Sequence, residues 1–233
     1  MLIIHNLTDT NVSPQSKTFF NIRFGLGEND FLQVNVLDDK KNHHPFIICL
    51  QKQKQTTWPL AALNQLTQAG FALVLLDLPD DTFQANLKVK TATRWLLQHA
   101  YQFGLDPFRY VLLSLDQSSS QAGLTALITA NKQAYSHEDV RVSPLHFRGA
   151  ILMAGLEETS TLELIANHDL RRLPNLCLIQ KQSDYAPQVA QALSQKADIT
   201  CFNLADDCPV EVFTSPYLLS KVKAFCQECF KKK

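Results

Sequence analysis

The sequence predicts a single α/β domain with a mostly parallel sheet, helices on both faces and an antiparallel hairpin at its N-terminal end. Short continuous apolar runs, typical of strands buried on both faces, alternate with helical patterns from residue 46 to residue 230. Parallel strands need crossovers that return the chain to the same edge of the sheet, and the helices supply them. A chain of 233 residues, 45% of them hydrophobic, can bury one sizeable core.

The first forty residues have a different pattern. Apolar and polar residues alternate over 18–24 and 31–37, as in strands with one solvated face. Four turn-forming residues separate the two runs: Gly25, Gly27, Asn29 and Asp30. The sequence therefore predicts one domain over residues 1–233, with the hairpin within residues 1–40 and the core over residues 44–230.

The first half of the core follows from three strands and two helices. The strands are apolar runs bounded by turn residues, predicted at 46–50, 71–76 and 110–113. The helices show apolar residues at spacings of three and four, predicted at 60–69 and 87–103. Gly70 and Gly104 follow these helices directly and mark their ends.

The second half continues the alternation. Strands are predicted at 149–153, 176–179 and 199–204, and helices at 117–131, 188–196 and 217–230. Residues 132–148, which contain three charged or titratable residues in a row and a proline, are expected to form a longer surface excursion.

Composition excludes several classes of partner. The chain has 22 basic and 22 acidic side chains, so no net charge attracts nucleic acid or an anionic membrane. No apolar stretch approaches the roughly 20 residues needed to cross a bilayer, and the start lacks the basic leader of a signal peptide. We therefore expect a soluble, cytoplasmic protein without a membrane span or a nucleic-acid partner.

Six cysteines do not indicate a secreted disulfide framework in a chain of this size. Two lie inside apolar runs and are interpreted as core hydrophobes, Cys49 and Cys177. Cys226 and Cys229 leave open a redox pair or half of a zinc site, whose further ligands would be Cys201 and Cys208. The helical pattern around this pair and the lack of a preceding thioredoxin-like βα unit favour buried thiols, so neither metal nor cofactor is expected.

Residues 111–123 have the outline of a strand, a tight turn and a helix: Val-Leu-Leu-Ser-Leu-Asp-Gln-Ser-Ser-Ser-Gln-Ala-Gly. In a nucleophile elbow the pattern is Gly-x-Ser-x-Gly, because the nucleophile sits on a strained turn between closely packed elements. Here small residues, Ser114 and Ser118, flank the turn, but Asp116 stands where the serine is expected.

The run Phe103-Gly104-Leu105-Asp106-Pro107-Phe108-Arg109-Tyr110-Val111-Leu112-Leu113 before this turn resembles α/β-hydrolases, in particular the small phospholipase/carboxylesterase family that includes acyl-protein thioesterases. In that family a similar Gly-Ile-Asp-Pro-x-Arg run leads into Gly-Phe-Ser-Gln-Gly-Gly, which matches here at Gln117. The resemblance covers roughly residues 44–230. It implies an α/β-hydrolase fold and places the catalytic acid at Asp184.

The chain departs from that family at two further places. Where the family has glycines after the first core strand, to turn backbone N–H groups onto an oxyanion, this chain has Leu50-Gln51-Lys52-Gln53-Lys54. Gln51 and Lys52, with Gln117, would line an altered oxyanion site in a polar crevice. We expect these longer side chains either to narrow the crevice or to bind a polar group there, and we expect no long acyl chain to enter. The catalytic histidine should follow the acid, yet no histidine occurs after His168.

Asp116 has two interpretations. It is either a carboxylate nucleophile or the N-cap of the following helix, where it accepts backbone N–H bonds and suits the helix dipole. Ser118, or Ser120 in the frame Ser120-Gln121-Ala122-Gly123, offers a rearranged elbow but would still lack its base. His137, His146 and His168 are interpreted as surface or capping residues rather than the base, and Asp184 as a loop carboxylate.

These observations predict a degenerate site formed by Asp116, Asp184 and Ser118. The main hypothesis is a pseudoenzyme of α/β-hydrolase fold that acts as a binding or interaction module for an unidentified protein or small polar ligand. The alternative is an active carboxylesterase or thioesterase-type hydrolase with a rearranged site around Asp116 or Ser118.

Overall fold

The computed structural model describes residues 3–6, 16–39, 43–52, 59–130, 144–153, 156–168, 173–182, 186–204 and 215–231. The strands within these ranges are β1 (Ile3–Asn6), β2 (Ser16–Arg23), β3 (Phe31–Leu37), β4 (His44–Lys52), β5 (Ala72–Leu78), β6 (Leu105–Ser114), β7 (Gly149–Met153), β8 (Asn175–Lys181) and β9 (Ile199–Leu204). The helices are α1 (Leu60–Gln68), α2 (Thr82–His99), the 3₁₀ turn η1 (Ala100–Phe103), α3 (Gln117–Ile128), α4 (Glu158–Ala166), α5 (Pro187–Ser194) and α6 (Pro216–Lys231).

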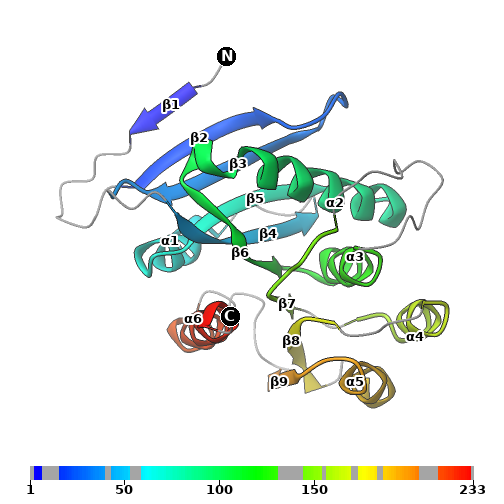
Figure 1. The fold of residues 1–233 in the computed structure, drawn as a ribbon. Coiled ribbons are helices and arrows are strands. Elements are labelled where there is room, and N and C mark those ends of the chain that lie inside the picture. The colour runs from blue at the N-terminus through cyan, green and yellow to red at the C-terminus, as the bar shows by residue number, and fades with distance from the viewer. Residues whose placement is uncertain are drawn as a thin grey trace.

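These strands form one sheet in the order β1-β2-β3-β5-β4-β6-β7-β8-β9 (Figure 1). The pairs β1–β2, β2–β3 and β3–β5 are antiparallel, and every pair from β5 to β9 is parallel. The predicted fold class is therefore confirmed, including the N-terminal hairpin, which β2 and β3 form and β1 extends by one strand.

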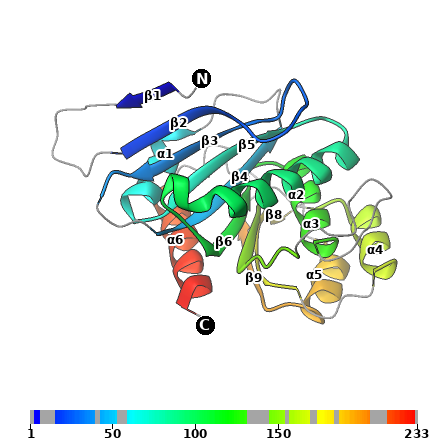
Figure 2. The ribbon, with the colours of Figure 1, turned by 45° about the horizontal axis from the view of Figure 1, so that its top comes forward.

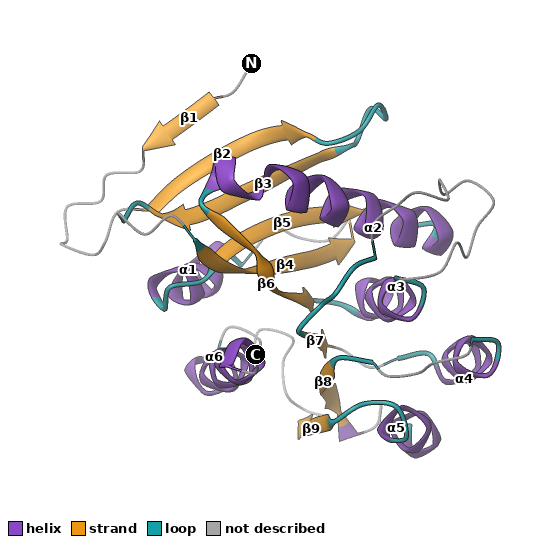
Figure 3. Ribbon diagram, viewed as in Figure 1, coloured by secondary structure: helices purple, strands orange, loops and turns teal. Residues whose placement is uncertain are grey.

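The helices cover both faces of the sheet. Helices α1 and α6 lie on one face, and α2, α3, α4 and α5 lie on the other (Figures 1 and 3). Alternate residues of β4 serve the two cores: Phe46, Ile48 and Leu50 pack on the side of α2 and α3, whereas Ile47 and Cys49 pack toward α1 and α6. All five are fully buried, which explains why this strand reads as a continuous apolar run.

The elements differ from the predicted ones mainly at their ends. Helix α2 begins at Thr82 rather than at residue 87, because the carboxylate of Asp81 accepts the N–H of Gln84 at 2.8 Å and caps the helix. Strand β1 and helix α4 were not predicted. Residues 144–148 are less exposed than the predicted excursion, since Leu145 and Phe147 are buried; residues 131–143 lie outside the described part of the chain.

The thiols of the Cys226–Cys229 pair face the core, as the helical pattern predicts. Both residues lie in α6 and are buried in the cluster that contains Cys49 and Cys177. Burial raises the pKa of the Cys226 and Cys49 thiols and raises that of Cys177 to about 12. Burial therefore disfavours the thiolate form of these groups, which is the form that acts as a nucleophile. No group of three or more metal-ligating side chains occurs within the described ranges.

Candidate functional site

The predicted elbow lies at the carboxyl end of the parallel strands, where open α/β sheets bind ligands. Strand β6 ends at Ser114 and α3 begins at Gln117, so the connection is very short (Figure 2). Neighbouring β4 ends at Lys52, and the N–H of Leu115 donates to the Leu50 carbonyl at 3.0 Å, which extends the β4–β6 ladder past the end of β6. The sheet register thus brings Lys52 beside Asp116.

Asp116 has the backbone of a helix N-cap. Its φ of −147° and ψ of 168° are extended, a conformation that any residue adopts. In the described part of the chain, the one non-glycine residue with positive φ is Asn21, at 50°. The turn at Asp116 therefore lacks the backbone strain that a nucleophile elbow stores.

Backbone N–H groups engage both oxygens of the Asp116 carboxylate. Oδ1 accepts the N–H of Ser119 at 2.8 Å, and Oδ2 accepts the N–H of Lys52 at 3.0 Å. The Ser119 hydroxyl accepts the Asp116 N–H at 3.1 Å, which completes a capping box. The first contact was predicted from the capping interpretation. The second joins α3 to β4 across 64 residues of sequence and was not.

The backbone N–H of Lys52 lies at the end of β4, next to the candidate nucleophile position. In nucleophile-elbow hydrolases, one oxyanion-hole donor is a backbone N–H in the loop after the strand equivalent to β4. Here the backbone N–H of Lys52, at the end of β4, donates to the carboxylate of Asp116. The carboxylate of Asp116 thus takes up the Lys52 N–H, a backbone donor of the kind that faces the substrate oxyanion in those hydrolases.

The side chains of Gln51 and Lys52 bind the end of β5. Gln51 is buried, and its Nε2 donates to Oδ1 of Asp77 at 3.1 Å. The Nζ of Lys52 forms an ion pair with Oδ1 of Asp80 at 3.2 Å. No role was predicted for either aspartate, although Asp77 lies near the end of β5 and Asp80 follows that strand.

One small cavity beside the elbow is lined by residues that the structure describes. A cavity of about 10 Å³ lies between the end of β5, α2 and the first turn of α3, enough for one water molecule at most. Its lining residues are Lys52, Leu78, Pro79, Asp80, Thr82, Ala85, Ser118 and Ser119. Both partners of the Lys52–Asp80 ion pair line this cavity.

The serines that follow Asp116 differ in exposure. Ser118 and the preceding Gln117 are exposed, whereas Ser120 is fully buried. The Ser120 hydroxyl donates to the Met153 carbonyl and lies 2.8 Å from the hydroxyl of Ser114, which in turn lies 3.2 Å from the Ile151 carbonyl. This chain of contacts ties α3 to β6 and β7, so Ser120 is a structural residue rather than an exposed nucleophile.

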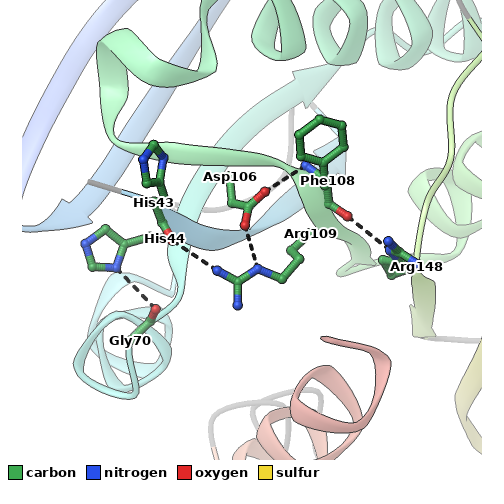
Figure 4. Close-up of polar contacts among 7 residues, drawn as sticks. All are labelled: His43, His44, Gly70, Asp106, Phe108, Arg109 and Arg148. Atoms are coloured by element: carbon green, nitrogen blue, oxygen red, sulfur yellow. Dashed lines mark hydrogen bonds and ion pairs between the residues drawn. The ribbon is translucent and has the colours of Figure 1, made fainter. Parts of the chain in front are cut away.

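Among the described residues, no histidine side chain contacts Asp116 or Ser118. His44 begins β4 at the opposite edge of the sheet, where its Nδ1 faces the Gly70 carbonyl at 3.4 Å (Figure 4). The Nδ1 of His168 lies 2.8 Å from the Leu164 carbonyl at the end of α4. His146 is exposed, and its backbone N–H, not its ring, donates to the hydroxyl of Tyr110. Two candidates, His137 and Asp184, fall outside the described residues.

The Asp-Pro-x-Arg run that carries the family resemblance lies near His44, at the amino-terminal ends of the parallel strands. Asp106 accepts the Phe108 N–H at 2.9 Å and pairs with Nε of Arg109 at 2.6 Å (Figure 4). Arg109 also donates to the His43 carbonyl at 3.3 Å. These residues join the start of β6 to the segment before β4, so their role in this chain is structural.

No family model and no curated protein matches the sequence. Solved structures do match. A truncated carbohydrate esterase from gut microbiota is 13% identical, with 95% of this chain and 99% of that chain covered and a TM-score of 0.75. An inhibited esterase B from Lactobacillus rhamnosis is 14% identical, with 93% and 88% covered and a TM-score of 0.70. Esterase 2 from Thermogutta terrifontis, phosphoramylated by tabun, is 16% identical, with 95% and 97% covered and a TM-score of 0.65.

The likeness to these esterases extends over almost the whole chain and establishes an α/β-hydrolase-like fold. At these identities it establishes the fold alone. The described part of the chain contains no helix that is both long and apolar enough to cross a membrane.

Proposed function

We propose that this protein is a non-hydrolytic relative of the small carboxylesterases, which works by binding a small polar ligand or a protein. One observation carries the proposal: the carboxylate at the nucleophile position uses both of its oxygens to hold backbone N–H groups of α3 and β4. Asp116 then serves as a helix cap and a tie between elements. The proposal keeps the resemblance to the phospholipase/carboxylesterase family and treats the catalytic site as degenerate.

The chemistry of acyl transfer supports this. A carboxylate nucleophile must direct a lone pair at the acyl carbon and expel the alcohol or thiol, and a base must then activate water to cleave the resulting mixed anhydride. Each oxygen of Asp116 already accepts a backbone N–H, which stabilises the carboxylate and lowers its reactivity as a nucleophile. The cavity that described residues form beside it has room for one water molecule at most. Removal of a single oxyanion-hole donor costs an acyl-transfer enzyme about two to three orders of magnitude in rate.

An active esterase is the second candidate, and the structural neighbours favour it. The similar structures are themselves described as esterases, two of them in inhibited or phosphoramylated forms. In this alternative Ser118, exposed in the first turn of α3, is the side chain best placed to act as a nucleophile. Its base would have to come from outside the described residues.

We expect the purified protein to hydrolyse p-nitrophenyl acetate, p-nitrophenyl butyrate and a short acyl thioester no faster than buffer does. The reason is the capped carboxylate together with the lack of a histidine near Asp116 among the described residues. Release of p-nitrophenol or thiol would be followed for the wild type, Asp116→Ala and Ser118→Ala. Turnover well above buffer that either substitution abolishes would overturn the proposal and support the esterase alternative.

A further inference from the structure

A second cavity lies at the same edge of the sheet, away from Asp116. It has a volume of about 410 Å³, within the range of about 300–1,000 Å³ typical of small-molecule sites. It lies between the tip of the β2–β3 hairpin and the first half of α2, two segments that Figures 1 and 2 both place side by side. Its lining residues are Phe24, Gly27, Glu28, Asn29, Asp30, Pro79, Gln84, Leu87, Lys88 and Thr91.

The hairpin wall of this cleft is held in place by its own hydrogen bonds. The Asp30 carboxylate accepts the Gly27 N–H at 2.7 Å, and the Asp30 carbonyl accepts the Phe24 N–H at 3.0 Å. The Arg23 guanidinium donates to the carbonyls of Gly25 and Leu26, each at 3.0 Å. A side chain at Gly25 would meet the Asp30 carboxylate and displace it from this position. Such a wall loses little entropy when a ligand binds.

Lys88 joins the two walls. It extends from α2, and its ammonium donates to the Asn29 carbonyl at 2.7 Å. Burial lowers its pKa, and the nearby carboxylates of Asp30 and Asp77 oppose that shift. One hydrogen bond leaves two of its three N–H donors for other acceptors. The cleft thus holds a partly desolvated donor at the junction of hairpin and helix.

The other polar groups in the cleft include both donors and acceptors. Within the described part of the chain, the carboxamide of Gln84 and the hydroxyl of Thr91 make no hydrogen bond, so a ligand could pair with both. Pro79 and Leu87, both partly exposed, add an apolar surface beside the buried Phe24. Glu28 and Asp30 outweigh Lys88 in formal charge, which disfavours an anionic ligand.

We propose that this cleft binds a short, neutral saccharide. Sugar hydroxyls both donate and accept hydrogen bonds, which suits a wall of carboxylate, carboxamide, hydroxyl and ammonium groups. The C–H face of a sugar ring suits the apolar surface. This inference deepens the proposed function, because it names a ligand class and a site for the binding role. It does not depend on the absence of ester hydrolysis.

Titration of the ¹⁵N-labelled protein with cellobiose and with xylobiose, followed by amide NMR, tests the proposal. We expect at least one disaccharide to shift the amides of Gly27, Asn29 and Lys88 in a saturable way. Gln84→Ala with Thr91→Val should weaken that binding about tenfold or more. Both positions are exposed, so the fold should survive, as the spectrum of the free variant would show.

Gln98→Ala is the matched control, since Gln98 is exposed on the same helix but does not line the cleft. It should bind like the wild type. The proposal is overturned if neither disaccharide gives saturable shifts, if the double variant binds like the wild type, or if glucuronate binds more tightly than the neutral sugars. Ester turnover in the separate assay would overturn the non-hydrolytic function and leave this result untouched.

Discussion

Replacement of Asp116 by alanine is expected to lower the free energy of unfolding by about 1–3 kcal/mol. The substitution removes the cap of α3 and also leaves the N–H of Lys52 without its acceptor. Asp116→Asn should be milder, because its carboxamide oxygen still accepts one N–H. Urea unfolding followed by circular dichroism would measure the change.

Asp81→Ala is the matched control for this prediction. Asp81 caps α2 through one contact, the Gln84 N–H at 2.8 Å, and is exposed. It should cost about 0.5–2 kcal/mol, the usual range for a lost cap. Equal costs for the two substitutions would mean that the link from Asp116 to β4 contributes nothing, and an unchanged midpoint for Asp116→Ala would contradict the capping role itself.

Ser120→Ala is the second substitution with a large expected effect. It removes a fully buried hydroxyl and deprives the Met153 carbonyl and the Ser114 hydroxyl of a partner. Loss of one partner in a buried pair costs about 1–3 kcal/mol. Ser118→Ala, an exposed position on the same helix, should stay within about 0.5 kcal/mol of the wild type. The same urea experiment would compare them.

Ester turnover and stability, measured on the same variants, distinguish a structural role of these serines from a catalytic one. If the protein does not hydrolyse esters, Ser120 contributes to stability alone. Wild type, Ser120→Ala and Ser118→Ala should then all lack ester turnover. The double variant Ser114→Ala, Ser120→Ala should cost less than the sum of the single changes, because it removes both partners of one pair. Simple additivity would contradict the coupling that the geometry indicates.

The sequence predicted the strands well where burial dictated them. The run at β4 is apolar on both faces because the sheet lies between two helix layers, and its pattern indicates that directly. Strand β1 has only four residues and pairs with β2 alone, which leaves little pattern to detect. Helix α4 begins after Glu157, which accepts the N–H groups of Thr159 and Ser160, a cap that the usual preference for Ser, Thr, Asp or Asn does not indicate.

The candidate site was predictable only in part. The capping contact of Asp116 with Ser119 is local, and the residue order predicts it. The contact with Lys52 depends on how β4 and β6 align in the sheet, where Leu50 pairs with Ser114. The cleft beside α2 depends on the approach of the hairpin to that helix, and no local motif signals it. Both the Lys52 contact and the cleft depend on how elements distant in sequence pack together, which local sequence patterns do not indicate.

The central claim is that Asp116 is a structural carboxylate and forms no acyl intermediate. Incubation of the protein with p-nitrophenyl butyrate in H₂¹⁸O, followed by peptide mass spectrometry of the segment from β6 to α3, tests it most directly. The account predicts that this segment keeps its unlabelled mass and carries no butyryl group. Incorporation of ¹⁸O into the Asp116 carboxylate, which attack of water on the aspartyl carbonyl of a mixed butyryl anhydride produces, or a butyryl adduct on Asp116 or Ser118 that forms and decays with turnover, would contradict it.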